Sequence, residues 1–180
     1  MFNQLRVLAL STVLLNINLA QAQEQKKPAG NYSAAVADIG IVVKDLEKSV
    51  KFYTEILGMK EVKGFNVPAE KAARFGLTDN QPATIRVFVL DQADGPKTKF
   101  KLMSFPQAPG KMQDQKFIHS TVGVSYVTLF VTDMDQAIER LKKSKVKLLG
   151  ETPSDLGGKT FITVFQDPDG NFIELIGPMK

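Results

Sequence analysis

The chain has 180 residues, a formal net charge of +4, a single histidine and no cysteine. This length suits one domain of ordinary size with a substantial core. The absence of cysteine excludes disulfides, a thiol nucleophile, thiolate metal ligands and anchoring through a lipid-modified N-terminal cysteine.

Residues 1–22 have the layout of a secretory signal peptide. Arg6 provides the positive start, residues 7–20 are mostly apolar, and Ala20-Gln21-Ala22 fits a signal-peptidase site. The apolar run is shorter than the roughly 20 residues that span a bilayer. We therefore predict cleavage after Ala22, export to the periplasm or the medium, and no stable membrane anchor afterwards. The alternative is an uncleaved N-terminal anchor.

The rest of the chain divides into a tether and a repeated domain. Residues 23–35 are small and polar, which is typical of a flexible tether. The domain covers residues 36–178, with module one at 36–106, a linker at 107–122 and module two at 123–178.

The two modules begin alike. Residues 38–45 and 126–133 are both β-branched, apolar strands that end in Asp, and an amphipathic helical pattern follows each. Asp45 and Asp133 occupy N-cap positions, and Gln136 makes the second a capping-box candidate. Gly58 is placed to end the first helix.

Three further strands are predicted after each helix, near residues 60–65, 84–90 and 99–105, and near 147–152, 159–166 and 172–176. Asp- and Gly-rich turns at residues 91–95 and 167–170 join the last two strands of each module, and residues 70–75 predict a short inserted helix. The fold class is therefore α+β: two tandem βαβββ modules form a curled mixed sheet with a central cleft and the helices outside.

Strand alternation sorts the side chains into a helix side and a concave side. We predict that the concave side carries cations, aromatic rings and carboxylates, namely Asp38, Arg86, Lys101, Tyr126, Phe130, Phe165 and Glu174. This mixture suits a small polar or anionic organic ligand. The lysines are spread along the chain, and the one dense group, at residues 142–147, is typical of a solvated helix face. We expect no nucleic-acid partner.

Two motifs carry a resemblance to a known family. Residues 45–58 read Asp-Leu-Glu-Lys-Ser-Val-Lys-Phe-Tyr-Thr-Glu-Ile-Leu-Gly, and residues 165–175 read Phe-Gln-Asp-Pro-Asp-Gly-Asn-Phe-Ile-Glu-Leu. With the repeat, residues 36–178 resemble the vicinal oxygen chelate (glyoxalase/bleomycin-resistance/dioxygenase) superfamily. Its members include lyases, isomerases, dioxygenases, thiol transferases and binding proteins, so the fold does not select the reaction.

The resemblance implies a divalent metal held at four positions, which here are Asp38, Lys101, Tyr126 and Glu174. Only Glu174 keeps the usual ligand type. An ammonium group about 4 Å from a cation costs about 4 kcal/mol at an effective dielectric near 20, which offsets one carboxylate ligand. We therefore expect no resident metal; if one binds, Asp38 and Glu174 are the candidate ligands. Glu174 could instead form an ion pair with Lys101 or Arg86.

Three functions remain open. The first is a metal-free protein that binds a small molecule. The second is a metal-dependent lyase or dioxygenase that uses Asp38 and Glu174, with Glu174 as the candidate catalytic residue. The third is a non-catalytic interaction module, including a homodimer. His119, which could serve acid-base chemistry, lies in the linker, where a surface role is the simpler interpretation.

Overall fold

The computed structural model describes residues 30–90 and 95–180. Ala34–Lys180 form one compact unit. The predicted signal peptide, most of the tether and most of the turn at 91–95 lie outside the described residues. Within the described part, no helix is long and apolar enough to cross a membrane.

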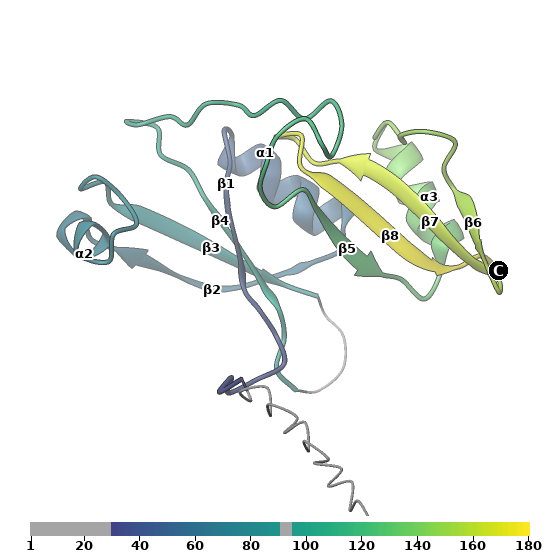
Figure 1. Cartoon of the computed structure of the whole chain (residues 1–180), viewed down its shortest axis with the longest axis horizontal. Coiled ribbons are helices and arrows are strands. Elements are labelled where there is room, and N and C mark those ends of the chain that lie inside the picture. The colour runs from purple at the N-terminus through teal and green to yellow at the C-terminus, as the bar shows by residue number, and fades with distance from the viewer. Residues whose placement is uncertain (1–29, 91–94) are drawn as a thin grey trace, which may run out of the picture. The chain divides into compact units, whose positions relative to one another are not determined.

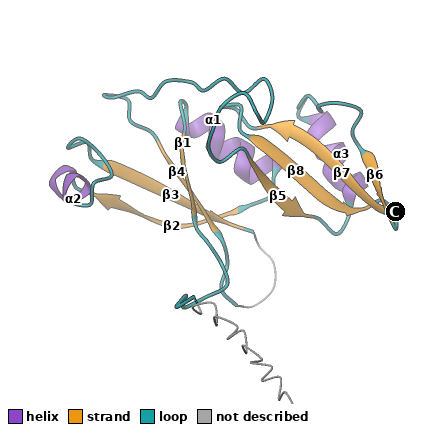
Figure 2. Ribbon diagram, in the orientation of Figure 1, coloured by secondary structure: helices purple, strands orange, loops and turns teal. Residues whose placement is uncertain are grey.

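Module one is a four-stranded sheet with its helix on one face (Figures 1 and 2). Its elements are β1 (Ile39–Val42), α1 (Leu46–Lys51), the π-helical turn η1 (Phe52–Ile56), β2 (Lys60–Val67), α2 (Ala69–Arg74), β3 (Ala83–Val89) and β4 (Lys99–Met103). The strand order is β1-β4-β3-β2, with β1 parallel to β4 and the other pairs antiparallel. The inserted helix α2 confirms the prediction for this stretch.

Module two repeats this topology. Its elements are β5 (Tyr126–Phe130), α3 (Met134–Lys143), β6 (Ser154–Gly157), β7 (Thr160–Gln166) and β8 (Phe172–Pro178). The strand order β5-β8-β7-β6 matches that of module one, so the predicted tandem repeat is confirmed. The strand expected at residues 147–152 is wrong: this segment contributes only a single bridge, from Leu148 to Phe165, and the strand forms after Pro153.

The helix starts follow the sequence prediction. The Asp45 carboxylate accepts a hydrogen bond from the Lys48 backbone N–H, and the Asp133 carboxylate accepts one from that of Gln136, both at 3.0 Å. The Gln136 side chain does not complete a capping box, because its oxygen accepts from Arg140 instead. The sequence did not predict the π-helical turn in residues 52–56, which ends just before Gly58.

One apolar core joins the helices of both modules to both sheets. Tyr53 lies 5.9 Å from Phe100, and Phe52 lies 6.2 Å from Phe165, as measured between ring centres. Tyr53 and Phe165 are fully buried. The helix of module one therefore packs on its own sheet and on β7 of module two, so the modules share their core.

Polar contacts fasten the turn at residues 167–170 to module one. The Tyr53 hydroxyl donates to the Asp167 carboxylate at 3.0 Å in a buried contact. Asp169 accepts hydrogen bonds from the Lys44 backbone N–H at 2.9 Å and from the Ser49 hydroxyl at 3.1 Å. We call these three contacts the intermodule clasp. Through these contacts, the two motifs that carry the family resemblance, residues 45–58 and 165–175, hold the two modules together.

Candidate ligand-binding site

Each sheet has one face packed on helices and an opposite face, which we call the open face. In module one, Phe100 and Leu102 are buried on the helix side, so Lys101 between them lies on the open face. The Lys101 ammonium contacts the Asp38 carboxylate at 2.8 Å and lies 5.9 Å from the centre of the Phe65 ring. The predicted residues Asp38 and Lys101 are thus brought together as an ion pair.

The ion pair changes the acidity of Asp38. The hydrogen bond from Lys101 is the main cause that holds the pKa of the Asp38 carboxyl below its ordinary value, and the Lys99 backbone N–H adds a weaker contact at 3.3 Å. The carboxylate is therefore ionised at neutral pH and already neutralised by its neighbour.

Module two contributes Tyr126, Phe130 and Glu174 on its open face. Glu174 stands opposite Thr128 in the β5–β8 register, and the Thr128 hydroxyl donates to its carboxylate at 2.7 Å. Tyr126 is 48% exposed and Phe130 is 78% exposed. The anticipated ion pair of Glu174 with Lys101 or Arg86 is absent among the described residues, because both cations have other partners.

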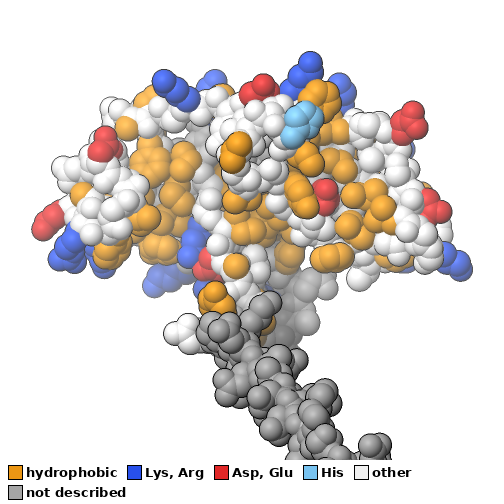
Figure 3. Space-filling model, in the orientation of Figure 1, with side chains coloured by type: hydrophobic (Ala, Val, Ile, Leu, Met, Phe, Trp, Pro, Cys, Tyr) orange, Lys and Arg blue, Asp and Glu red, His pale blue; other side chains and the backbone are white. Residues whose placement is uncertain are grey.

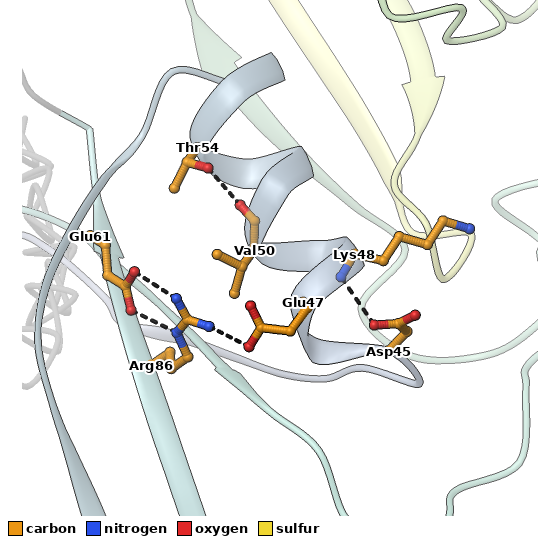
Figure 4. A network of polar contacts seen from close by, with 7 residues as sticks. All are labelled: Asp45, Glu47, Lys48, Val50, Thr54, Glu61 and Arg86. Carbon is orange, nitrogen blue, oxygen red and sulfur yellow. Dashed lines mark hydrogen bonds and ion pairs between the residues drawn. The ribbon is translucent and has the colours of Figure 1, made fainter.

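Arg86 lies on the helix side, so its predicted place on the concave side is wrong. It stands opposite Leu102 in the β3–β4 register. Its guanidinium bridges Glu61 on β2 and Glu47 on α1, with contacts of 2.7 Å to each (Figure 4). These hydrogen bonds, that to Glu61 first, raise the pKa of Arg86 and lower that of Glu61. Arg86 joins helix to sheet and is not available to a ligand on the open face.

Phe165 is also misplaced by the sequence prediction. It stands opposite Ile173, which packs in the core, and the Phe165 side chain is fully buried on the helix side. An aromatic ring in the shared core stabilises the fold by removing apolar surface from water. Phe165 therefore cannot line the open face.

A cavity of about 550 Å³ lies between β1 and β5. Asp38 and Tyr126 line it from opposite modules, together with the polar side chains of Gln113, Ser125 and Asn171. Apolar residues, including Val124 and Phe172, complete the wall. Mostly apolar walls with a few convergent polar groups are typical of small-molecule sites.

The predicted metal positions do not offer a fitting donor set. Asp38 is paired with an ammonium group, Tyr126 is a neutral phenol, and Glu174 is bound to Thr128. In residues 30–90 and 95–180, no three His, Cys, Asp or Glu side chains gather closely enough to hold a metal ion. Lys101 places a positive charge where the resemblance implies a fourth ligand, which opposes a divalent cation.

His119 takes the surface position in the linker that the sequence analysis favoured. It is exposed and stacks on Phe117, with ring centres 5.4 Å apart. Hydrophobic side chains also reach the surface around this histidine (Figure 3). The position of Thr128 on the open face could have been predicted, because it lies two residues after Tyr126 in the same strand. The position of Gln113 could not, because it lies in an irregular linker without strand or helix periodicity.

Comparison with known families gives one match over most of the chain. Residues 35–175 match the model of the Glyoxalase/Bleomycin resistance protein/Dioxygenase superfamily. Similar curated proteins include the lactoylglutathione lyase of Pseudomonas putida, which is 28% identical over 76% of this chain and 80% of its own length. The lactoylglutathione lyase of Escherichia coli O157:H7 is 28% identical over 74% of this chain and 85% of its own length. A probable chloroplastic lactoylglutathione lyase of Arabidopsis thaliana is also 28% identical over 74% of this chain, which spans only 33% of that protein.

Solved structures show the same fold. A glyoxalase family protein of Bacillus cereus has a TM-score of 0.70 at 21% identity, covering 84% of this chain and 99% of its own. A fosfomycin resistance protein of Listeria monocytogenes has a TM-score of 0.54 at 17% identity, covering 82% and 96%. At these identities the likeness concerns architecture.

Proposed function

The chain belongs to the glyoxalase/bleomycin resistance protein/dioxygenase superfamily, and within it we propose a metal-independent protein that binds a small polar or anionic organic molecule. The observation that carries this proposal is the ion pair between Asp38 and Lys101, 2.8 Å apart, at two positions where the family resemblance implies metal ligands. An ammonium group in that place favours an organic ligand over a cation.

The proposed ligand occupies the cavity between β1 and β5. Asp38 and Tyr126 offer a charged acceptor and a phenol, and Val124 and Phe172 offer apolar contact. Lys101 does not line this cavity, but its ammonium group neutralises the Asp38 carboxylate at the cavity wall, so Asp38 does not repel an anionic group of the ligand. A compact molecule with one polar or anionic end and an apolar body satisfies these groups.

A thermal-shift screen of small carboxylates, carbonyl compounds and phenols, performed in a chelator, tests the proposal. A hit should bind about tenfold more weakly to the Asp38→Asn and Tyr126→Ala variants, because each loses a contact of about 1.5 kcal/mol. Asp79→Asn is the matched control, since Asp79 is exposed and outside this cavity. A hit that requires an added divalent ion would contradict the proposal.

A metal-dependent lyase or dioxygenase is the second candidate. The observation in its favour is that Glu174 lies on the open face, in a family whose curated relatives include lactoylglutathione lyases. In this alternative the chain would convert a glutathione hemithioacetal or a catechol, and Glu174→Ala would abolish turnover. Turnover that is unchanged by chelator would exclude it.

We also propose that the mature protein is exported and forms a homodimer. The signal-peptide pattern of residues 1–22 supports export. The exposed side chains of Val42, Phe65 and Phe130 on the open faces support self-association, since a second copy would remove them from water. Mass spectrometry of protein from its native host should find Gln23 at the N-terminus, and light scattering should give twice the chain mass. An intact Met1 or a monomer would contradict these proposals.

A further inference from the structure

A second cavity, on the helix side of the sheets, is lined by three lysines. It has a volume of about 440 Å³ and lies where α1 and η1 of module one meet the segment after α3 in module two. Lys48 and Lys51 line it from α1, and Lys147 lines it from the opposite module. We call this cavity the basic groove.

The three ammonium groups are available to a ligand. Within residues 30–90 and 95–180, none of the three lysines forms an ion pair, and each is exposed. Two carboxylates also line the groove. Glu55 is exposed. Asp167 is buried and accepts hydrogen bonds from the Tyr53 hydroxyl, the Asn171 side chain and two backbone N–H groups. Asp167 therefore has no free oxygen for a lysine.

The wall between the lysines is apolar. Phe52 and Ile56 come from η1, and Val146 and Leu149 come from the facing segment; all but Phe52 are partly exposed. The π-helical turn widens the helix where it borders the groove, and such turns recur at functional sites. Cations around a partly exposed apolar wall match a ligand that has an anionic end and an apolar body.

We propose that the basic groove is a second binding site, separate from the cavity between β1 and β5, for an organic anion with an aromatic or acyl body. Carboxylate, sulfonate and phosphate ends share the required chemistry. Because the groove is walled by both modules, its ligand would contact both sides of the intermodule junction. Binding in the basic groove is independent of the ligand proposed for the cavity between β1 and β5.

Fluorescence titration of the full mature chain with anilinonaphthalene sulfonate tests the proposal, because this probe has an anionic end and an aromatic body. The variant Lys48→Gln, Lys51→Gln, Lys147→Gln should bind the probe roughly tenfold more weakly, as expected for three exposed charge contacts. The control variant Lys63→Gln, Lys142→Gln, Lys143→Gln has the same net charge and changes lysines outside the groove. It should bind like the wild type.

Two further measurements distinguish binding in the groove from attraction of the probe to the net positive charge of the protein. Leu149→Ser removes an apolar contact of the groove and should also weaken probe binding. Circular dichroism should show that each variant is folded. Decanoate and naphthoate should compete with the probe for the wild type. Equal loss in both lysine variants would overturn the proposal, because net charge would then explain binding. Loss on Tyr126→Ala with no loss in the groove variant would also overturn it, by placing the probe in the other cavity.

Discussion

The hydrogen bond from Tyr53 to Asp167 is the one buried contact of the intermodule clasp, and its removal should destabilise the whole domain. Tyr53 is fully buried, Asp167 is 6% exposed, and 3.0 Å separates the two oxygens. Tyr53→Phe keeps the ring contacts with Phe52 and Phe100 and removes one donor from a buried carboxylate. Loss of a hydrogen bond to a charged group costs about 1.5–3 kcal/mol.

The three other donors to Asp167 remain in the variant, so we expect the lower half of that range, about 2 kcal/mol. For a domain of this size, 2 kcal/mol corresponds to a fall in Tm of about 4–8 °C. Chemical denaturation and calorimetry of the wild type, Tyr53→Phe and Tyr32→Phe measure the change. Tyr32 is 89% exposed and provides the matched control.

The pH dependence provides a second test of the same contact. Burial, followed by the charge of Asp167, raises the pKa of Tyr53 above its ordinary value of 10.0. The folded state then retains a proton that the unfolded chain releases, so this contribution to stability is present below pH 10.0 and is lost as the pH rises further. Tyr53→Phe should remove that alkaline loss. A variant as stable as the wild type, with an unchanged alkaline slope, would refute the reasoning.

Two further substitutions test other contacts. Arg86→Gln should lower the free energy of unfolding by about 1 kcal/mol at neutral pH without changing ligand affinity, because Arg86 binds Glu47 and Glu61 on the helix side. Since the pKa of Glu61 is lowered, the difference in stability between wild type and variant should be present above pH 4.5 and shrink as the pH falls below it. A variant that loses ligand affinity but no stability would contradict the position of Arg86 on the helix side. Gly177→Ala should cost about 1–3 kcal/mol because the added methyl group would overlap the Val131 carbonyl oxygen. Gly110→Ala, in open space, should show no such loss in urea unfolding.

The repeat and most of the open face follow from sequence periodicity. Alternation in the short strands β1, β4, β5 and β8 places Asp38, Lys101, Tyr126, Phe130 and Glu174 correctly, because apolar residues of the helix side alternate with them along the chain. The prediction for Arg86 was wrong because β3 has consecutive buried residues on both faces. Alternation therefore does not determine which face of the sheet carries the arginine. A slip of one residue in register reverses the side of every side chain in the strand. The prediction for Phe165 was wrong although the sequence held the necessary information. Phe165 pairs with Ile173, which was expected on the helix side, and paired residues of neighbouring strands lie on the same face.

The partners of the charged side chains could not be predicted from the sequence. Lys101 could have paired with Glu174 or Asp38, and only the parallel register of β1 and β4 selects Asp38. The π-helical turn could not be predicted from the sequence either, since the spacing of Leu46, Val50, Tyr53 and Leu57 fits an ordinary α-helix. Both the basic groove and the intermodule clasp arise from packing between modules, which no local pattern encodes.

Elemental analysis of the protein purified from its native compartment tests the central claim most directly. Because Lys101 is paired with Asp38 where a metal ligand is implied, we predict that divalent metal is far below one ion per chain. We also predict that the content does not change in the Glu174→Ala variant. About one manganese, iron, nickel or zinc ion per chain, lost on that substitution, would contradict the account.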